Sequence, residues 1–177
     1  FYRATWDQAW HASAYFELAG LSCLQRKFTD ALEQVERAIA TNGFNTKARN
    51  LKAAILRNSG RPAEAELAAS SALKIDPLDF WAINEIFLSQ LIQKKRSAAT
   101  QSLEQLAVLM RDDVQAYLEL ATDYMQAGMW SDARHVLQRP CKAQKHPACV
   151  YPLLHYYLGY LEQQLGNDSL ATACFDR

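Results

Sequence analysis

The sequence predicts an all-α protein built from stacked helical hairpins, and three observations support this fold class. Small residues recur at a constant interval of 34, at Ala31, Ala65, Ala99 and Ala133. Within each interval the apolar residues follow the spacing of amphipathic helices. No segment alternates between polar and apolar residues for long enough to indicate a β-strand. Because one hairpin cannot bury its apolar face alone, such a period indicates hairpins that share a continuous core.

A second column of residues keeps the same period. It lies twelve residues before each of these alanines and is occupied mainly by small side chains. Small residues are expected where the two helices of a hairpin cross closely, because the contact leaves no room for a large side chain. The column consists of Ala19, Ala53, Phe87, Ala121 and, in a fifth interval, Gly159.

Residues 46–79 show how one interval is divided into two helices. The first half carries a single apolar stripe, and Gly60 ends it because glycine readily adopts the left-handed conformation. Pro62 opens the second helix, where a missing N–H is harmless, and the Asp76-Pro77 pair stops it. The stripe consists of Ala48, Leu51, Ala54 and Ile55.

The fourth interval is interrupted by Pro140. A proline inside a helix removes a hydrogen bond and clashes with the preceding turn, at a cost of about 3 kcal/mol. We therefore expect the helix to end near Arg139 and residues 140–151 to form a long loop. The fifth unit then begins at residues 150–152, four residues late.

Composition and charge exclude several classes of protein. The 177 residues carry 19 basic and 19 acidic side chains, so the net charge is zero. This balance argues against a surface built for nucleic acid or for anionic lipid, and no apolar stretch is long enough to span a membrane. Four cysteines are too few for a disulfide scaffold. We expect a cytoplasmic fragment of a longer protein, since the chain lacks an initiator Met and a signal peptide.

No catalytic motif of the common kinds is present, so we expect no enzyme, no cofactor and no metal. The Asp112-Asp113 pair falls at a unit boundary, where it is expected to cap the next helix. A zinc site or a Cys141–Cys149 disulfide in the 140–149 loop is the less favoured alternative, because a zinc site needs three or four ligands in tetrahedral reach. Its candidate ligands are Cys141, His146, Cys149, His135 and His155.

The chain resembles the tetratricopeptide repeat family, whose 34-residue unit is a helix–turn–helix. Ala53, Ala65, Ala72 and Pro77 carry the match best, whereas Phe87 departs from the family pattern. The resemblance implies a right-handed α–α superhelix of about four and a half to five hairpins, in a single domain over residues 1–177. Its repeats would cover residues 12–45, 46–79, 80–113 and 114–147, and an incomplete unit at 152–177.

A looser resemblance concerns the segments TWDQAWH, KARNLKAAILRNSGRPAEA and DPLDFWAINE. They are similar to the carboxy-terminal repeat region of large bacterial proteins of unassigned function. In those proteins the repeats follow a β-sandwich that resembles galactose mutarotase. This resemblance implies a bacterial source and a carbohydrate-related context.

The family resemblance implies a non-catalytic interaction scaffold, because the first helix of each unit lines a concave groove in that family. A peptide or partner domain would bind there, with cations pairing carboxylates and amides bonding the peptide backbone. The alternative is an accessory module that packs on an upstream β-sandwich of the same chain through Trp6 and Trp10. RNA recognition and a metal-dependent hydrolase are further alternatives. The predicted groove residues are Lys47, Asn50, Arg57, Trp81, Asn84 and Gln115.

Overall fold

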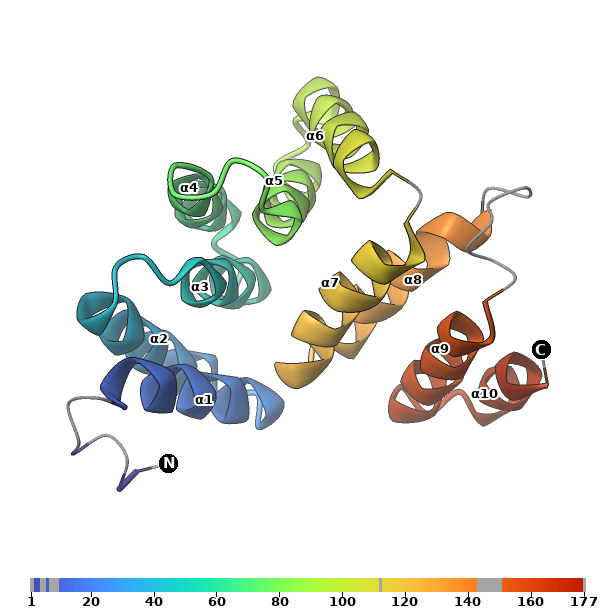
Figure 1. The fold of residues 1–177 in the computed structure, drawn as a ribbon, viewed down its shortest axis with the longest axis horizontal. Helices are drawn as coiled ribbons and strands as arrows, with labels where there is room; N and C mark the ends of the chain where they lie inside the picture. The colour runs from blue at the N-terminus through green and yellow to red at the C-terminus, as the bar shows by residue number, and fades with distance from the viewer. Residues whose placement is uncertain (1, 4–5, 7–9, 112, 143–150, 177) are drawn as a thin grey trace. The chain divides into compact units, whose positions relative to one another are not determined.

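The computed structural model describes residues 2–3, 6, 10–111, 113–142 and 151–176, and within these it contains ten α-helices and no β-strand (Figure 1). From α1 to α8 and from α9 to α10, successive helices follow each other after only a few residues, as the sequence pattern predicts. Their bounds are α1 His11–Leu24, α2 Phe28–Thr41, α3 Thr46–Asn58, α4 Pro62–Leu73, α5 Phe80–Ile92, α6 Arg96–Met110, α7 Val114–Gln126, α8 Trp130–Lys142, α9 Pro152–Gln164 and α10 Asp168–Phe175.

The 34-residue period is visible directly in the helix starts. Helices α3, α5 and α7 begin at residues 46, 80 and 114, and α4, α6 and α8 begin at 62, 96 and 130. Helix α9 begins at Pro152, so the predicted delay of the fifth unit is confirmed. The chain divides into two compact units, Phe1–Leu109 and Met110–Arg177. The single solenoid domain over residues 1–177 stays a prediction.

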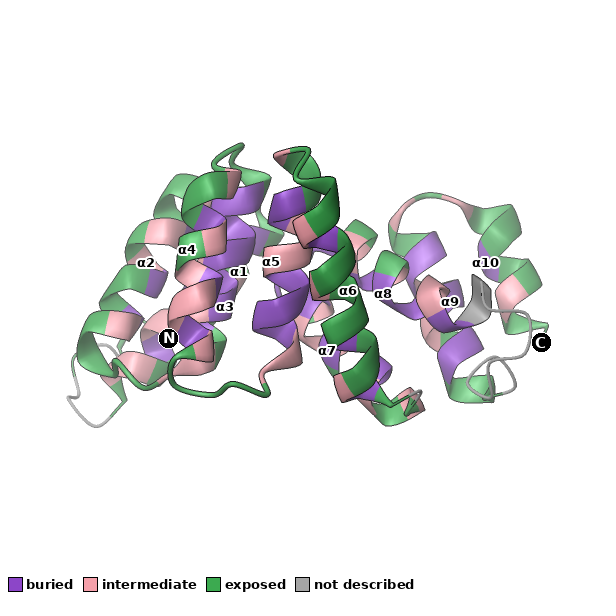
Figure 2. Cartoon of the chain, turned by 90° about the horizontal axis from the view of Figure 1, so that it is seen from above, coloured by how far each residue is buried: buried purple, intermediate pink, exposed green. Residues whose placement is uncertain are grey.

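The small residues lie where the two helices of each hairpin cross. The four alanines of the main column, at 31, 65, 99 and 133, have at most 1% of their surface exposed. In the last hairpin the contact leaves little room for a side chain, because a Cβ atom added at Gly159 would lie 2.5 Å from a ring carbon of Phe175. The buried stripes of the hairpins are shown in Figure 2. Side-chain size at this column therefore sets how closely the two helices pack.

The turn inside every hairpin has the same backbone conformation. At its centre one residue has a positive φ, and the backbone N–H of the next residue reaches back to a carbonyl of the preceding helix. In the third hairpin the N–H of Lys95 donates to the carbonyl of Gln90 at 2.9 Å, and that of Lys94 donates to Leu91 at 3.0 Å. This is the Schellman arrangement, which satisfies the last carbonyls of a helix. The positive-φ residues are Arg26, Gly60, Lys94, Gly128 and Gly166.

The turns between hairpins use side-chain caps instead. Asn45, Asp79 and Asp113 precede α3, α5 and α7, and a side-chain oxygen of each accepts a backbone N–H of the first turn at 3.0 Å. Such caps satisfy N–H groups that have no partner within the helix. The predicted capping role is thereby confirmed for Asp113, whereas Asp112 lies outside the described residues.

The prediction for Pro140 is wrong, because α8 continues through this residue to Lys142. Pro140 lies in the last turn of the helix, so few backbone hydrogen bonds depend on it. It occupies the repeat position of the buried Ala38 and Ala72, and it is buried as well. Burial of its apolar ring offsets the lost hydrogen bond. The rest of the predicted loop, residues 143–150, lies outside the described residues.

The turn conformation predicts an unusual stabilising substitution. Lys94 adopts a φ of 61°, which costs an L-residue free energy that glycine does not pay. We expect Lys94→Gly to raise the free energy of unfolding by about 0.5–1 kcal/mol, measured by urea denaturation. Gly60→Ala is the matched control: a Cβ there meets no atom within 4 Å, so backbone strain alone should lower stability by about 1 kcal/mol. A destabilised Lys94→Gly variant would contradict this account of the turn.

Candidate interaction surface

Four of the six predicted groove residues are buried. Asn50, Arg57, Trp81 and Asn84 lie on α3 and α5 with 0–8% of their surface exposed. The other two, Lys47 on α3 and Gln115 on α7, are exposed. In the first unit α3 packs directly against α5, so the polar side chains between them serve helix packing. Sequence reasoning assigned all six to an open surface, and for the four buried residues that placement is wrong.

The strongest polar contact between α3 and α5 is a buried ion pair. Arg57 Nε donates to Glu85 Oε2 at 2.8 Å, and its Nη2 donates to Oε1 at 3.1 Å. The side chains are 7% and 0% exposed. Two parallel hydrogen bonds between a guanidinium and a carboxylate fix both orientation and distance. In the sequence, Glu85 is a carboxylate within the mainly apolar stretch that begins α5, and a charge in such a stretch indicates a buried partner.

A second contact joins the same two helices at their other end. The Asn50 side chain donates through Nδ2 to Oδ2 of Asp79 at 2.7 Å. The other oxygen of Asp79 accepts the N–H of Ala82 and caps α5. One carboxylate therefore both starts a helix and holds it to its neighbour. Together with the Arg57–Glu85 pair, this contact ties α3 to α5 at two separate levels.

Glu66 connects α4 to α5 and to the turn that follows α5. Its carboxylate accepts from Gln90 Nε2 at 3.0 Å, from Gln93 Nε2 at 2.8 Å and from Lys95 Nζ at 2.9 Å. Partial burial raises the pKa of Glu66, but hydrogen bonds from these three donors outweigh it, so the pKa lies below its ordinary value. The carboxylate therefore stays ionised at neutral pH.

The first and third hairpins each contain a hydrogen bond between a serine and a glutamine at equivalent positions, but the two residues have exchanged places. In the first hairpin Ser22 Oγ donates to Gln34 Oε1 at 2.8 Å. In the third, Ser102 Oγ donates to Gln90 Oε1 at 2.9 Å. Both pairs are twelve residues apart and occupy equivalent repeat positions, but serine and glutamine have changed helices.

An exposed row of side chains remains at the carboxyl ends of the first helices. Leu24, Asn58 and Ile92 stand at the same repeat position, and Leu91 lies beside the last of them. The three apolar members are 43–52% exposed, and Asn58 is also exposed. We call these four residues the exposed row. They belong to the predicted groove face of the first unit, and their apolar side chains are exposed to solvent there.

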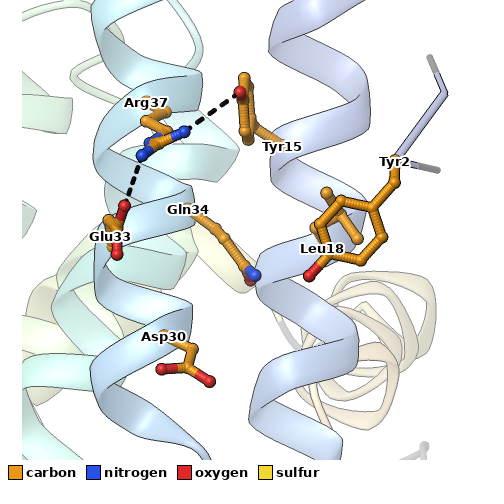
Figure 3. Close-up of a pocket in the computed structure, with 7 residues that line it drawn as sticks. All are labelled: Tyr2, Tyr15, Leu18, Asp30, Glu33, Gln34 and Arg37. Atoms are coloured by element: carbon orange, nitrogen blue, oxygen red, sulfur yellow. Dashed lines mark hydrogen bonds and ion pairs between the residues drawn. The ribbon is translucent and has the colours of Figure 1, made fainter. Parts of the chain in front are cut away.

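A pocket of about 240 Å³ lies between α1 and α2 (Figure 3). Arg37 crosses it, donating to the Tyr15 hydroxyl at 3.3 Å and pairing with Glu33. The guanidinium also lies 5.5 Å from the centre of the Tyr15 ring. The sequence analysis does not predict this pocket. Its arginine already binds Tyr15 and Glu33 of the same chain. The remaining lining residues are Tyr2, Leu18, Asp30 and Gln34.

The other predicted sites lie partly outside the described residues. Trp6 and Trp10 are 86% and 62% exposed, so both indoles are available for contact. His146, Cys149 and the side chain of Cys141 are not described, which leaves the zinc and disulfide alternatives untested. Among the described residues no cluster of three metal-binding side chains occurs. Burial raises the pKa of the Cys23 thiol to about 12 despite the nearby charge of Arg26, so this thiol is unreactive at neutral pH.

Comparison with known proteins finds a family match for part of the chain and similar folds for most of it. Residues 25–80 match the family model of the tetratricopeptide repeat. MamA from Desulfovibrio magneticus RS-1 superimposes with a TM-score of 0.56 at 20% identity, covering 96% of this chain and 92% of that one. PilF of Pseudomonas aeruginosa gives a TM-score of 0.56 at 20% identity, covering 92% and 72%.

Residues 25–80 thus carry a match to the tetratricopeptide repeat, and the chain as a whole has the fold of tetratricopeptide-repeat structures. A third structure with this fold is YrrB, a tetratricopeptide protein with an unusual peptide-binding site. Its TM-score is 0.52 at 15% identity, covering 92% of this chain and 81% of YrrB. The predicted fold class, an all-α superhelix of tetratricopeptide repeats, is therefore confirmed.

Other comparisons add limits to this assignment. No curated protein sequence matches the chain. The similarity to bacterial proteins with a mutarotase-like β-sandwich has no support in these comparisons. None of the described helices has the length and apolar character needed to cross a lipid bilayer.

The buried ion pair between Arg57 and Glu85 gives a test of how α3 and α5 are held together. Arg57→Met leaves the Glu85 carboxylate buried without its partner and should lower the free energy of unfolding by about 3–5 kcal/mol. The double variant Arg57→Met/Glu85→Leu should recover most of this loss, because it leaves no buried charge. Urea denaturation of the two single variants and the double variant measures the coupling. Additive losses in the double variant would contradict the pairing.

Proposed function

We propose that this chain is a non-catalytic scaffold that binds a peptide or a partner domain on the face formed by the first helices of its hairpins. The observation that carries the proposal is the exposed row, where Leu24, Leu91 and Ile92 present apolar surface beside the amide of Asn58. Apolar side chains next to amide groups suit an extended peptide, whose backbone needs hydrogen bonds and whose side chains need pockets.

The predicted groove residues take two roles in this proposal. Lys47 and Gln115 are exposed and remain candidates for direct contact with a ligand. Asn50, Arg57, Trp81 and Asn84 are buried, so we assign them to positioning the helices that carry the exposed row. A rigid face reduces the entropy lost on binding. The expected cytoplasmic location belongs to the proposal as well.

The proposal predicts which substitutions abolish peptide binding. Peptides selected from a displayed random library on the wild-type chain should lose at least about tenfold in affinity with Leu91→Asp/Ile92→Asp, because a charge replaces apolar contact area. Leu67→Asp on α4 is the control, since Leu67 is 72% exposed and belongs to a second helix. Affinities would be measured by fluorescence anisotropy, with circular dichroism to verify folding. Selected peptides that bind the Leu91/Ile92 variant as well as wild type would refute this binding face.

A second candidate function is favoured by the exposure of Trp6 and Trp10. Exposed indoles are typical of contact surfaces, so these residues would pack on another domain of the same polypeptide. Hydroxyl-radical footprinting should then show lower oxidation of both tryptophans in the longer polypeptide than in the 1–177 segment. Equal oxidation in the two forms would rule out the contact. Leu67, exposed on α4, serves as the internal reference.

A further inference from the structure

The turns inside the three hairpins of the first unit are basic. Each of them joins the end of a first helix to the start of a second helix, and Figure 2 shows the turns after α3 and α5 on the same edge of the unit. All of the cationic residues in and next to these turns are exposed. We call this group the basic edge; it consists of Arg26, Lys27, Arg61, Lys94, Lys95 and Arg96.

Local stability explains only part of this positive charge. A cation after the carboxyl end of a helix complements the helix dipole, as at Arg26 and Lys94, but other features of these positions are unfavourable. Arg26 and Lys94 have φ angles of 59° and 61°, at a turn position where the other three hairpins have glycine. Lys27 and Arg61 are the N-cap residues of α2 and α4, and neither makes a side-chain capping hydrogen bond. A positive charge at a helix N-terminus also opposes the helix dipole. Residues that break local rules in this way are expected where function requires them.

The positive charge is only partly compensated within the chain. Arg61 pairs with Glu64, and Lys95 pairs with Glu66 at 2.9 Å. The remaining four cations of the basic edge pair with no carboxylate in the described part of the chain. In both intra-chain pairs the partner is a glutamate carboxylate of α4, which shows that these positions accept a carboxylate.

The charge is also concentrated on this edge. On the opposite edge of the first unit, the turn at residues 42–45 has no charged residue, and the turn at 74–79 contains one lysine and two aspartates. In the second unit the corresponding hairpin turns, at residues 127–129 and 165–167, carry no charge. A chain with zero net charge thus has one strongly cationic border, which attracts anions locally.

We propose that the basic edge binds an acidic segment of a partner polypeptide. This proposal rests on the scaffold function and names the chemistry of the partner. Leu24 and Ile92 of the exposed row precede the positive-φ residues of their turns by two positions, so an apolar side chain stands beside the cations in the first and third turns. A segment in which Asp or Glu alternates with apolar residues complements this order.

A lipid surface fits the same edge less well. Interfacial binding relies on aromatic and apolar anchors that enter the headgroup region. The three turns, at residues 25–27, 59–61 and 93–95, contain no aromatic residue. The cations are instead distributed over successive hairpins, as an extended chain crossing those hairpins requires.

The experiment compares two variants with the same loss of charge. The probe is a short fluorescein-labelled peptide of alternating glutamate and leucine, and its dissociation constant is measured by anisotropy. Lys27→Gln/Lys94→Gln should raise the dissociation constant about tenfold, which corresponds to about 0.7 kcal/mol for each cation. Lys74→Gln/Arg111→Gln, on exposed residues between hairpins, should change it less than about twofold. Increasing salt should weaken the wild-type complex.

Each other outcome overturns the proposal in a distinguishable way. Equal weakening in both variants would mean that net charge alone attracts the peptide, and no change in the edge variant would mean that the edge is not the site. Tighter, edge-dependent retention on phosphatidylcholine vesicles containing phosphatidylserine would assign the edge to a lipid surface. If the edge variant has no effect on the glutamate–leucine peptide while the library-selected peptides still lose affinity with Leu91→Asp/Ile92→Asp, the edge has failed and the scaffold function stands. Unchanged urea midpoints would verify that all variants are folded.

Discussion

The close crossing of two helices at a small residue is the constraint on which the rest of this structure depends. When alanine occupies that point, the two helices of a hairpin approach closely and expose a single apolar face to the next hairpin. A fixed period follows, because every hairpin must present the same face at the same height. The turns, the caps and the exposed row are all positioned by this repeat. A change at one crossing would therefore disturb the packing of its neighbours as well as its own hairpin.

Polar contacts then fix the arrangement of particular pairs of helices. The Arg57–Glu85 pair and the Asn50–Asp79 bond hold α3 and α5 at two levels, and Glu66 ties α4 to the turn after α5. Such buried charges contribute less to stability than to fixing one arrangement, because desolvation offsets most of their attraction. The first unit thus combines a generic apolar stack with a few bonds that select its geometry. Side chains that resemble ligand contacts in the sequence are used inside the protein.

Features that recur in every repeat of this fold could be predicted from the sequence, whereas features that occur at one helix or one helix pair could not. The alanine columns and the Asp113 cap depend on short-range patterns, so the predicted unit boundaries at residues 46, 80 and 114 coincide with the starts of α3, α5 and α7. Pro140 was misjudged because local helix propensity was weighed without the burial of its ring. Arg57 was misjudged because its partner, Glu85, lies on another helix, and only the packing of α3 against α5 shows that their side chains meet. The cations of the basic edge are far apart in the sequence. Only the arrangement of the hairpins brings turns such as those after α3 and α5 to the same edge of the unit.

The exchanged serine–glutamine pairs show how such a fold tolerates sequence change. Ser22 with Gln34, and Gln90 with Ser102, make equivalent bridges although neither position keeps its amino acid. The hydrogen bond between the two positions is therefore kept from one repeat to the other, although the amino acid at each position is not. A comparison of one repeat position at a time does not reveal it. Exchanges of this kind are one way in which chains with about one identical residue in five can still have backbones that superimpose.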